Sequence, residues 1–372
     1  MGLSVALKSR ILEFVRNLFP DYFAEKFLQK SRKGTTYIYG GYETLSHIKE
    51  NCEFFLSQEQ LDDSEYMHKI YLDIIKCHFR YGTNANEYFC YKFQTLEAKE
   101  RKMYLPRMKK DMLLIKYMGD GWKEHFNQLK DKYRFYLLSQ KFFGRDVCQV
   151  VKESDYTGFE KIVSKHGRVF VKPSLGGCGV GAQIIDLVEY GNDPKNAFGY
   201  LLSLGTPVIV EEIIKQDERI SVWNSSSINT LRIPSFRTKD GIRILYPSIR
   251  IGRAGSIIDN AGGGGIFAAV GPEDGKIITV GFDKRGNMFD VHPDSGKQLM
   301  GAMVPQWDEL VKTVTDLHHL LPEKHKYVAF DMALSTSGWV LVEANWGELT
   351  MPQIEFSKGL YKEFYNCLYD NR

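Results

Sequence analysis

The chain has 372 residues, of which 43% are hydrophobic and 26% are charged, a composition typical of a soluble globular protein with two or three subdomains. The 49 basic and 46 acidic residues leave a net charge of +3, which gives no support for nucleic acid as a partner. The six cysteines are widely separated, so neither a disulfide framework nor a structural metal site is expected. We expect a reducing, cytoplasmic location, and no apolar run reaches the roughly 18 residues that a transmembrane segment needs.

The N-terminal third is expected to be helical. Apolar residues recur at helical spacing from Ile11 onward and predict an amphipathic helix over 9–30, which Pro20 interrupts or kinks. Packing against the rest of the protein is the favoured explanation of its apolar face, and peripheral contact with a membrane is the alternative. The segment 43–115 shows helical periodicity without a recognisable motif. We therefore expect a helical accessory region over residues 1–120.

Alternating helices and strands are expected in the middle of the chain. They are a helix at 131–143, a strand at 146–151, a helix at 156–166, a strand at 169–172 and a strand at 207–214. Glu211 and Glu212 interrupt the last of these apolar runs, which indicates a buried strand whose far end lies at a site. Such alternation with short connections predicts an α/β or α+β layout.

A glycine-rich loop follows the strand at 169–172. Lys172 ends the strand, Pro173 stops it, and Ser174 begins the loop. The glycines of the loop are Gly176, Gly177, Gly179 and Gly181. Glycine permits positive φ angles and a close approach of the backbone, so successive N–H groups can face phosphate oxygens while Lys172 supplies a positive charge. A plain hairpin turn is the alternative, because glycine-rich turns between strands are common.

Two further strands, at 227–237 and 242–251, are expected to present arginines. Alternation of polar and apolar residues places Arg232 and Arg250 on polar faces. Two guanidinium groups from neighbouring strands suit two-point binding of an anion, and surface salt bridges are the alternative.

A second glycine-rich loop contains four consecutive glycines at 262–265. Because glycine runs cost conformational entropy on folding, close contact with a ligand or a mobile lid is the expected purpose. Asn260, at the start of this loop, is a candidate for orienting a substrate group, and a plain turn residue is the alternative.

The last feature is a predicted hairpin of buried strands at 327–333 and 339–345. Asp331 lies among apolar neighbours, and Glu343 and Asn345 share one strand face because they are two residues apart. Three converging oxygen ligands suit Mg²⁺. Buried carboxylates without a cation would cost on the order of several kcal/mol, and a structural ion pair with a lysine is the alternative.

This ordered set of motifs resembles the ATP-grasp superfamily over residues 125–370. The motifs are the helix that begins at Asp131-Lys132, the strand that ends at Lys172, Glu211 with Glu218 seven residues later, Asp331, and Glu343 with Asn345. The strand Asn229-Thr230-Leu231-Arg232 and the second glycine-rich loop further resemble the sugar-transfer-associated ATP-grasp group, which is tied to surface polysaccharide synthesis. The resemblance implies an α+β ATP-grasp fold whose two subdomains, 121–215 and 216–372, grip ATP.

The resemblance also implies roles for individual residues. Lys132 and Lys172 would bind nucleotide phosphates, the loop 174–181 would close over them, Glu211 with the backbone of Glu212 and Ile213 would read adenine, and Glu218 would hold the ribose. Asp331, Glu343 and Asn345 would bind two Mg²⁺ ions. Arg232 and Arg250 are then candidates for holding a substrate carboxylate or the transferred phosphoryl group.

The implied activity is that of an ATP-dependent carboxylate-amine ligase that acts through an acyl-phosphate. Its partners would be ATP, a small-molecule or sugar carboxylate such as a uronic acid, and an amine or amino acid acceptor, in surface or capsular polysaccharide synthesis. A kinase of a sugar or small molecule is one alternative, and a nucleotide-binding accessory subunit of a polysaccharide assembly complex is another. The helical N-terminal region departs from the usual plan of the superfamily, so the sequence does not identify the part that binds the acceptor. The sequence does not identify the oligomeric state either.

Overall fold

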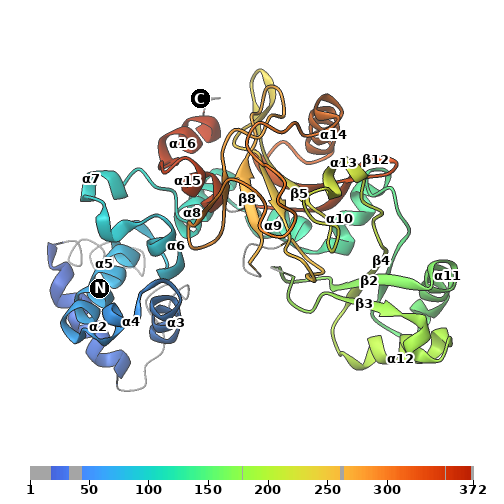
Figure 1. The fold of residues 1–372 in the computed structure, drawn as a ribbon, viewed down its shortest axis with the longest axis horizontal. Helices are drawn as coiled ribbons and strands as arrows, with labels where there is room; N and C mark the ends of the chain where they lie inside the picture. Colours follow the sequence, from blue (N-terminus) through green and yellow to red (C-terminus); the bar gives the residue numbers. More distant parts are fainter. Residues whose placement is uncertain (1–17, 33–43, 178, 260–263, 348, 370–372) are drawn as a thin grey trace. The chain divides into compact units, whose positions relative to one another are not determined.

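The computed structural model describes residues 18–32, 44–177, 179–259, 264–347 and 349–369 (Figure 1). The chain forms two compact units. Unit 1 comprises residues 1–116 and 348–366, and unit 2 comprises residues 117–347 and 367–372. The segment 348–366 thus groups with the N-terminal helices by compactness, and the predicted subdomain boundaries at 121–215 and 216–372 stay predictions.

The described part of unit 1 is helical, as the periodicity of 43–115 predicts. Its elements are α2 (Pro20–Arg32), α3 (Leu45–Phe55), α4 (Gln58–Asp62), α5 (Ser64–Tyr81), α6 (Ala85–Cys90), η1 (Phe93–Thr95), α7 (Ala98–Arg101), α8 (Arg107–Met118), α15 (Thr350–Glu355) and α16 (Tyr361–Tyr369). The side chains of Thr44, Ser57, Asp63 and Asn84 cap four of these helices. Of the helix expected over 9–30, residues 9–17 lie outside the described part. Pro20 begins α2, where its missing N–H has no intrahelical partner to lose.

Gln353 explains why the late segment belongs to unit 1. Its Oε1 accepts hydrogen bonds from the backbone N–H of Leu105 at 2.7 Å and of Leu360 at 3.2 Å. Its Nε2 donates to the Leu105 carbonyl and to the hydroxyl of Tyr91, both at 3.1 Å. A buried amide with all these partners is fully satisfied, so it joins α15 to two helical segments more than 200 positions earlier in the chain.

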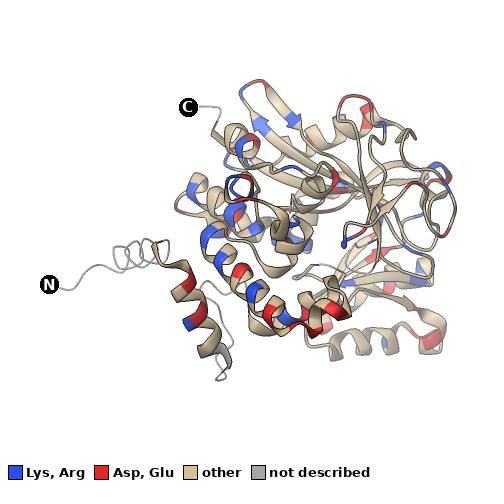
Figure 2. Cartoon of the chain, turned by 60° about the vertical axis from the view of Figure 1, so that its left-hand side comes forward, with Lys and Arg blue, Asp and Glu red and all other residues tan. Residues whose placement is uncertain are grey.

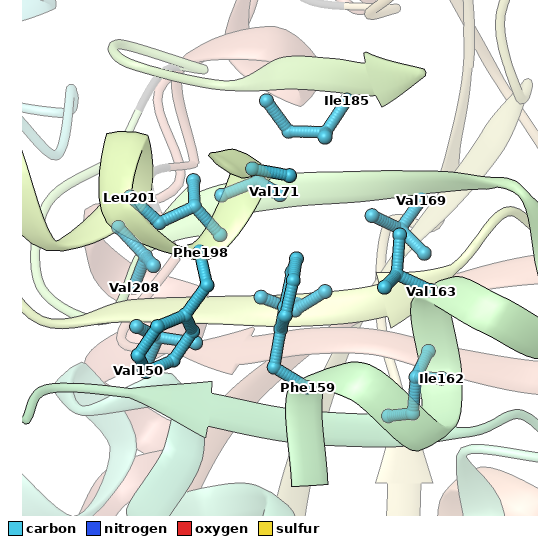
Figure 3. Packing of buried hydrophobic residues seen from close by; sticks show 12 residues of the cluster. Val150, Phe159, Ile162, Val163, Val169, Val171, Ile185, Phe198, Leu201 and Val208 are labelled. Carbon is cyan, nitrogen blue, oxygen red and sulfur yellow. The ribbon is translucent and has the colours of Figure 1, made fainter. Parts of the chain in front are cut away.

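A four-stranded antiparallel sheet forms the first part of unit 2. Its strands are β1 (Val147–Val150), β2 (Arg168–Pro173), β3 (Gln183–Asp186) and β4 (Val208–Glu212), in the order β1-β4-β2-β3. Helices α11 (Tyr156–His166) and α12 (Pro194–Ser203) pack on it, and Figure 3 shows Phe159 and Phe198 among the strand valines. The first glycine-rich loop joins β2 to β3, which are antiparallel neighbours, so it is also a hairpin connection.

An eight-stranded antiparallel sheet forms the second part. Its strands are β5 (Thr230–Thr238), β6 (Gly241–Ile244), β7 (Ser248–Ile251), β8 (Ile266–Ala269), β9 (Gly281–Phe282), β10 (Met288–Phe289), β11 (Tyr327–Ser335) and β12 (Gly338–Asn345). The path runs β10-β9-β8-β7-β5-β11-β12, and β6 pairs with β5. The other elements of unit 2 are α9 (Trp122–Lys130), α10 (Lys132–Ser139), η2 (Gln140–Phe142), η3 (Glu153–Asp155), η4 (Leu187–Tyr190), α13 (Glu218–Ser221) and α14 (Trp307–His319).

One strand prediction was wrong in this sheet. The single strand expected over 242–251 is divided into β6 and β7. Tyr246 lies between them with φ of 55°, a left-handed conformation that does not continue a strand, and Pro247 follows it. The expected hairpin of buried strands is confirmed as β11 and β12, and the mixed α+β character is confirmed as well.

The structure shows the mixed charge and the moderate hydrophobicity that the composition predicts. Figure 2 shows the positions of basic and acidic residues interspersed along the ribbon. None of the described helices combines the length and the apolar character that a membrane span requires.

Buried histidines are expected to make the protein sensitive to acid. Burial lowers the pKa of His318 from 6.5 to about 4, and its Nε2–H donates to the carbonyl of His325 at 2.7 Å. Because the unfolded chain takes up this proton more readily than the folded chain, stability falls as the pH drops from 6.5 towards 4. We expect His318→Gln to flatten the dependence of the unfolding free energy on pH in that interval, measured by urea titration. The exposed His319 provides the control, and equal slopes for His318→Gln, His319→Gln and wild type would contradict the expectation.

Candidate active site

Lys132 connects the start of α10 to the first glycine-rich loop. Asp131 caps this helix by accepting from the backbone N–H of Tyr133 and Arg134, which fixes Lys132 as the first helical residue. The backbone N–H of Lys132 donates to the carbonyl of Ser174 at 3.0 Å, and its Nζ donates to the carbonyl of Gly176 at 2.8 Å. Burial lowers the pKa of this lysine. The predicted phosphate-binding lysine therefore touches the predicted phosphate-binding loop at two points.

The loop itself needs glycine at two positions at least. Gly179 has φ of 70° and Gly181 has φ of 75°. A Cβ atom on Gly179 would lie 2.5 Å from Ile258, and one on Gly181 would lie 2.9 Å from Pro173. Both glycines therefore serve a turn and a close approach, as the sequence suggested.

Other residues of this loop differ in their environment. Gly176 also has a positive φ, of 113°, whereas the φ of Gly177 is not positive. At both positions the space that a Cβ atom would occupy is open. Ser174 is buried, and its hydroxyl accepts from Nε2 of Gln149 at 3.2 Å. Its side chain thus anchors the loop to β1.

Lys172, Glu211 and Arg145 form a buried ion triad. One carboxylate oxygen of Glu211 lies 2.9 Å from Nζ of Lys172, and the other lies 2.8 Å from Nη2 of Arg145. Burial alone would raise the pKa of Glu211, but the two cations outweigh it and hold that pKa below its usual value. Lys172 also approaches the carbonyl of Val342 at 3.4 Å, and Arg145 donates to that of Leu341 at 2.7 Å. The triad thereby links the small sheet to β12 of the large one.

Asp331 lies at the centre of a second charged cluster. On β11, Asp331 lies directly opposite Arg232 of the neighbouring strand β5 and directly opposite Glu343 of the neighbouring strand β12. Arg232 binds both oxygens of the fully buried Asp331 carboxylate, through Nε and, at 2.9 Å, through Nη2. Nη2 of Arg250 also donates to Asp331, at 3.1 Å. The ion pair considered from sequence exists, but its cations are the two arginines that were predicted to bind substrate, not a lysine.

The two carboxyl groups of this cluster have opposite electrostatic environments. Burial would raise the pKa of Asp331, but Arg232 and Arg250 hold it below the usual value. The pKa of Glu343 is raised, first by burial and then by the charge of Asp331, and Lys172 only partly offsets this. Two facing carboxylates that repel one another, next to Asn345, make a donor set that a hard divalent cation would stabilise.

Asn345 completes this donor set. Its Nδ2 lies 3.5 Å from Oε1 of Glu343, so the side chain is directed at the same position. Rotation about its terminal bond would present the amide oxygen instead, and the two orientations are nearly isosteric. The side chains of Asp331, Glu343 and Asn345 therefore have the oxygen chemistry that Mg²⁺ prefers, and their role as metal ligands stays a prediction.

The structure adds three residues that the sequence analysis did not select. Arg145 pairs with Glu211, as described above. The hydroxyl of Thr230 accepts from Nε and Nη2 of Arg250, at 3.0 and 2.8 Å, and bonds to the buried Asp259. Arg145 and Asp259 carry no sequence signal, because their partners lie on other strands, whereas Thr230 belongs to the strand 229–232 that carries part of the family resemblance.

The remaining predicted site residues lie apart from these contacts. Glu212 accepts from the backbone N–H of Asp146 at 3.1 Å, on the opposite face of β4 from Glu211. Ile213 and Glu218 are exposed, and Glu218 begins α13. Asn260 lies outside the described residues, as do Gly262 and Gly263. The nucleotide-binding and substrate roles of these residues stay predictions.

A small cavity lies beside the two clusters. Its lining residues are Leu129, Lys132, Phe135, Phe143, Glu211, Val342, Glu343 and Ala344. The cavity therefore has apolar walls from α9, α10 and β12, with one cation and two carboxyl groups. Its volume of about 10 Å³ accommodates a single water molecule, which is too little space for a nucleotide base.

The fold and this arrangement of lysines, glycine-rich loop and carboxylates define an ATP-grasp protein. Residues 122–367 match the family described as sugar-transfer associated ATP-grasp, so the chain belongs to that family. The resemblance stated from sequence, and the fold expected with it, are confirmed.

Solved structures similar to this chain include D-alanyl-alanine synthetase A from Vibrio cholerae, at 14% identity over 65% of this chain and 64% of that one, with a TM-score of 0.40. D-alanine–D-alanine ligase from Bacillus anthracis is 14% identical over 65% and 66%, with a TM-score of 0.38. L-amino acid ligase from Bacillus licheniformis is 10% identical over 65% and 48%, with a TM-score of 0.38. The chain thus spans about two thirds of the first two proteins and about half of the third. No curated protein matches the chain.

Proposed function

We propose that this protein is an ATP-dependent carboxylate-amine ligase that forms a C–N bond through an acyl-phosphate. One observation carries the proposal. Lys132 at the start of α10 and Lys172 of β2 act electrostatically on Glu343, and Arg232 and Arg250 of the large sheet bind Asp331, which faces Glu343. Phosphoryl transfer to a carboxylate brings two anions together, and it needs positive charge and positioning more than an acid and a base.

In this proposal the small sheet binds ATP. Lys132 and Lys172 neutralise the phosphates, and the backbone of the loop 174–181 covers them. Lys172 is held by Glu211 at 2.9 Å, so its ammonium group is already positioned before the nucleotide arrives. Glu211 and the backbone of Glu212 and Ile213 supply the adenine contacts that the family resemblance implies, and Glu218 supplies the ribose contact.

The large sheet holds the metal and the acid substrate. Mg²⁺, bound by Asp331, Glu343 and Asn345, would neutralise charge that develops on the transferred phosphoryl group. Arg250 is the better candidate for contacting the substrate carboxylate, because it is shared among Thr230, Asp259 and Asp331. Arg232 is engaged with Asp331 through two atoms, and it orients that carboxylate.

The family to which the chain belongs supports a proposal for the substrate class. We propose a uronic-acid sugar, or a nucleotide- or lipid-linked precursor of one, as the carboxylate, and an amino acid or amine as the acceptor, in surface polysaccharide synthesis. We place the reaction in the cytoplasm, where ATP is available. The family's link to sugar transfer supports this assignment.

A trapping experiment tests the proposal. The purified full-length protein is incubated with Mg²⁺-ATP, hydroxylamine and a panel of uronic acids and their nucleotide-linked forms. A ligase releases ADP and forms a hydroxamate, because hydroxylamine attacks the acyl-phosphate. A stable phosphate ester without hydroxamate would identify a kinase, and ATP binding without ADP release across the panel would favour an accessory subunit.

The nucleotide part of the proposal predicts a selective loss in Lys172→Met. Without its charge-assisted contact to phosphate, ATP should bind about 2 kcal/mol more weakly, whereas the affinity for adenosine should hardly change. Calorimetry with both ligands measures this difference. Arg168→Met is the matched control, because it removes a positive charge from the exposed start of the same strand. Equal losses for ATP and adenosine would mean that Lys172 does not face the phosphates.

A further inference from the structure

We infer that Asp146, His166 and Glu212 form a binding site for a transition-metal dication, separate from the ATP site. One side-chain atom from each of the three residues lies within 4.8 Å of the others. Nε2 of His166 is 2.9 Å from Oδ2 of Asp146 and 3.8 Å from Oε2 of Glu212. Among the described residues this is the one group of three His, Cys, Asp or Glu side chains that converge in this way.

Each of the three residues is fixed by regular structure. Asp146 directly precedes β1, and Glu212 ends β4, the antiparallel neighbour of β1. The backbone N–H of Glu212 donates to the Asp146 carbonyl at 2.9 Å, and the N–H of Asp146 donates to Oε2 of Glu212 at 3.1 Å. His166 is the last residue of α11, which ends because Gly167 adopts a φ of 69°. Ligands held by three element ends need little reorganisation to bind an ion.

The ligand types select the class of metal. One imidazole nitrogen and two carboxylate oxygens suit Zn²⁺ and its neighbours in the first transition row, at about 2.0–2.2 Å from each atom. Mg²⁺ prefers oxygen ligands alone. Movements of the ligand atoms by about 1 Å would allow all three to contact one Zn²⁺ ion. Three protein ligands leave the fourth position of the ion open, as in catalytic zinc sites.

The charge balance at the site is incomplete without a cation. Nζ of Lys165 lies 2.7 Å from Oδ2 of Asp146 and is the nearest full positive charge. The Lys165 side chain is 61% exposed. An exposed ion pair contributes only about 0–1 kcal/mol, so a dication can displace the ammonium group at small cost.

The metal site uses the side chain of Glu212, whereas the proposed adenine contact uses only its backbone. Arg145 and Glu211 directly precede Asp146 and Glu212, and their buried ion pair lies on the other face of the same two strand ends. The inference therefore does not rest on the proposed function.

Zinc titration of the full chain tests this inference. Calorimetry is run at saturating Mg²⁺, so that hard-metal sites are occupied, on wild type, His166→Gln and Lys165→Met. We expect one Zn²⁺ site in wild type that weakens at least about tenfold in His166→Gln. In Lys165→Met the competing ammonium group is gone while all three ligands remain, so Zn²⁺ should bind more tightly, by up to about fivefold. Mg²⁺-ATP affinity should be the same in all three proteins.

Cobalt provides a second readout. Co²⁺ bound through His166 should give visible absorption bands in wild type and Lys165→Met that are missing in His166→Gln. Asp146→Asn serves as the second ligand variant if His166→Gln does not fold. Zinc affinity and cobalt spectra that are identical in wild type and the ligand variants would overturn the proposed metal site. If wild type does not bind Mg²⁺-ATP, that result counts against the proposed function and not against the metal site.

Discussion

Replacing Glu343 by glutamine is expected to lower ADP formation by at least about 100-fold while leaving the protein at least as stable as wild type. Even a residue that only orients a metal ligand costs up to about that factor, and Glu343 is proposed to be a ligand itself. Its raised pKa shows that the folded protein disfavours the charged form. A neutral, nearly isosteric side chain removes this repulsion from Asp331.

The pH dependence provides a check on this argument. A carboxyl group whose pKa is raised by folding destabilises the fold at neutral pH, and this effect disappears below the pKa of the unfolded chain. The stability advantage of Glu343→Gln should therefore be largest at neutral pH and vanish in acid. Urea unfolding at several pH values, with ADP release measured on the same samples, tests both parts. Full turnover at saturating Mg²⁺ would remove the metal assignment.

Replacing Asp331 by asparagine should have the opposite effect on stability. The variant leaves the guanidinium groups of Arg232 and Arg250 in a buried site without their shared counter-charge. Removing one partner of a buried ion pair costs about 3–5 kcal/mol, so we expect a loss of that size in unfolding free energy at neutral pH. The pKa of Asp331 is lowered in the fold, so this contribution is present at neutral pH and is lost as the pH falls through that lowered value.

Glu343→Gln is the matched control for Asp331→Asn. The two carboxyl groups face each other on neighbouring strands, and each variant removes one negative charge from the same place. Both should lose activity, but only Asp331→Asn should lose stability. If the unfolding free energy of Asp331→Asn falls by less than about 1 kcal/mol, then solvent, and not Asp331, stabilises the positive charges of the two arginines.

The sequence was informative where one residue type has one local consequence. Apolar periodicity located α11 and β2 to within one residue, and Gly179 and Gly181 adopt the positive φ angles expected of them. Their role in binding phosphate stays a prediction. Strand alternation correctly placed Arg232 and Arg250 on polar faces. These features depend on neighbours in the chain.

The sequence was uninformative where the partner lies on another strand. Metal ligands and substrate-binding arginines were treated as separate groups, yet Asp331 binds Arg232 and Arg250 directly. Cross-strand register determines this contact, and register cannot be read from one strand alone. Arg145 and Asp259 were missed for the same reason. The break between β6 and β7 was missed because tyrosine seldom adopts a positive φ.

The discontinuous composition of unit 1 has a consequence for how the protein is made. During synthesis the N-terminal helices leave the ribosome first, but Gln353 and the rest of 348–366 follow more than 200 residues later. Until then, the backbone groups of Leu105 lack their buried partners. Unit 1 must therefore be completed after translation of unit 2, against the usual order in which N-terminal domains finish first. A nascent chain stopped before α15 would contain every ATP-site residue proposed here and still lack a finished N-terminal unit.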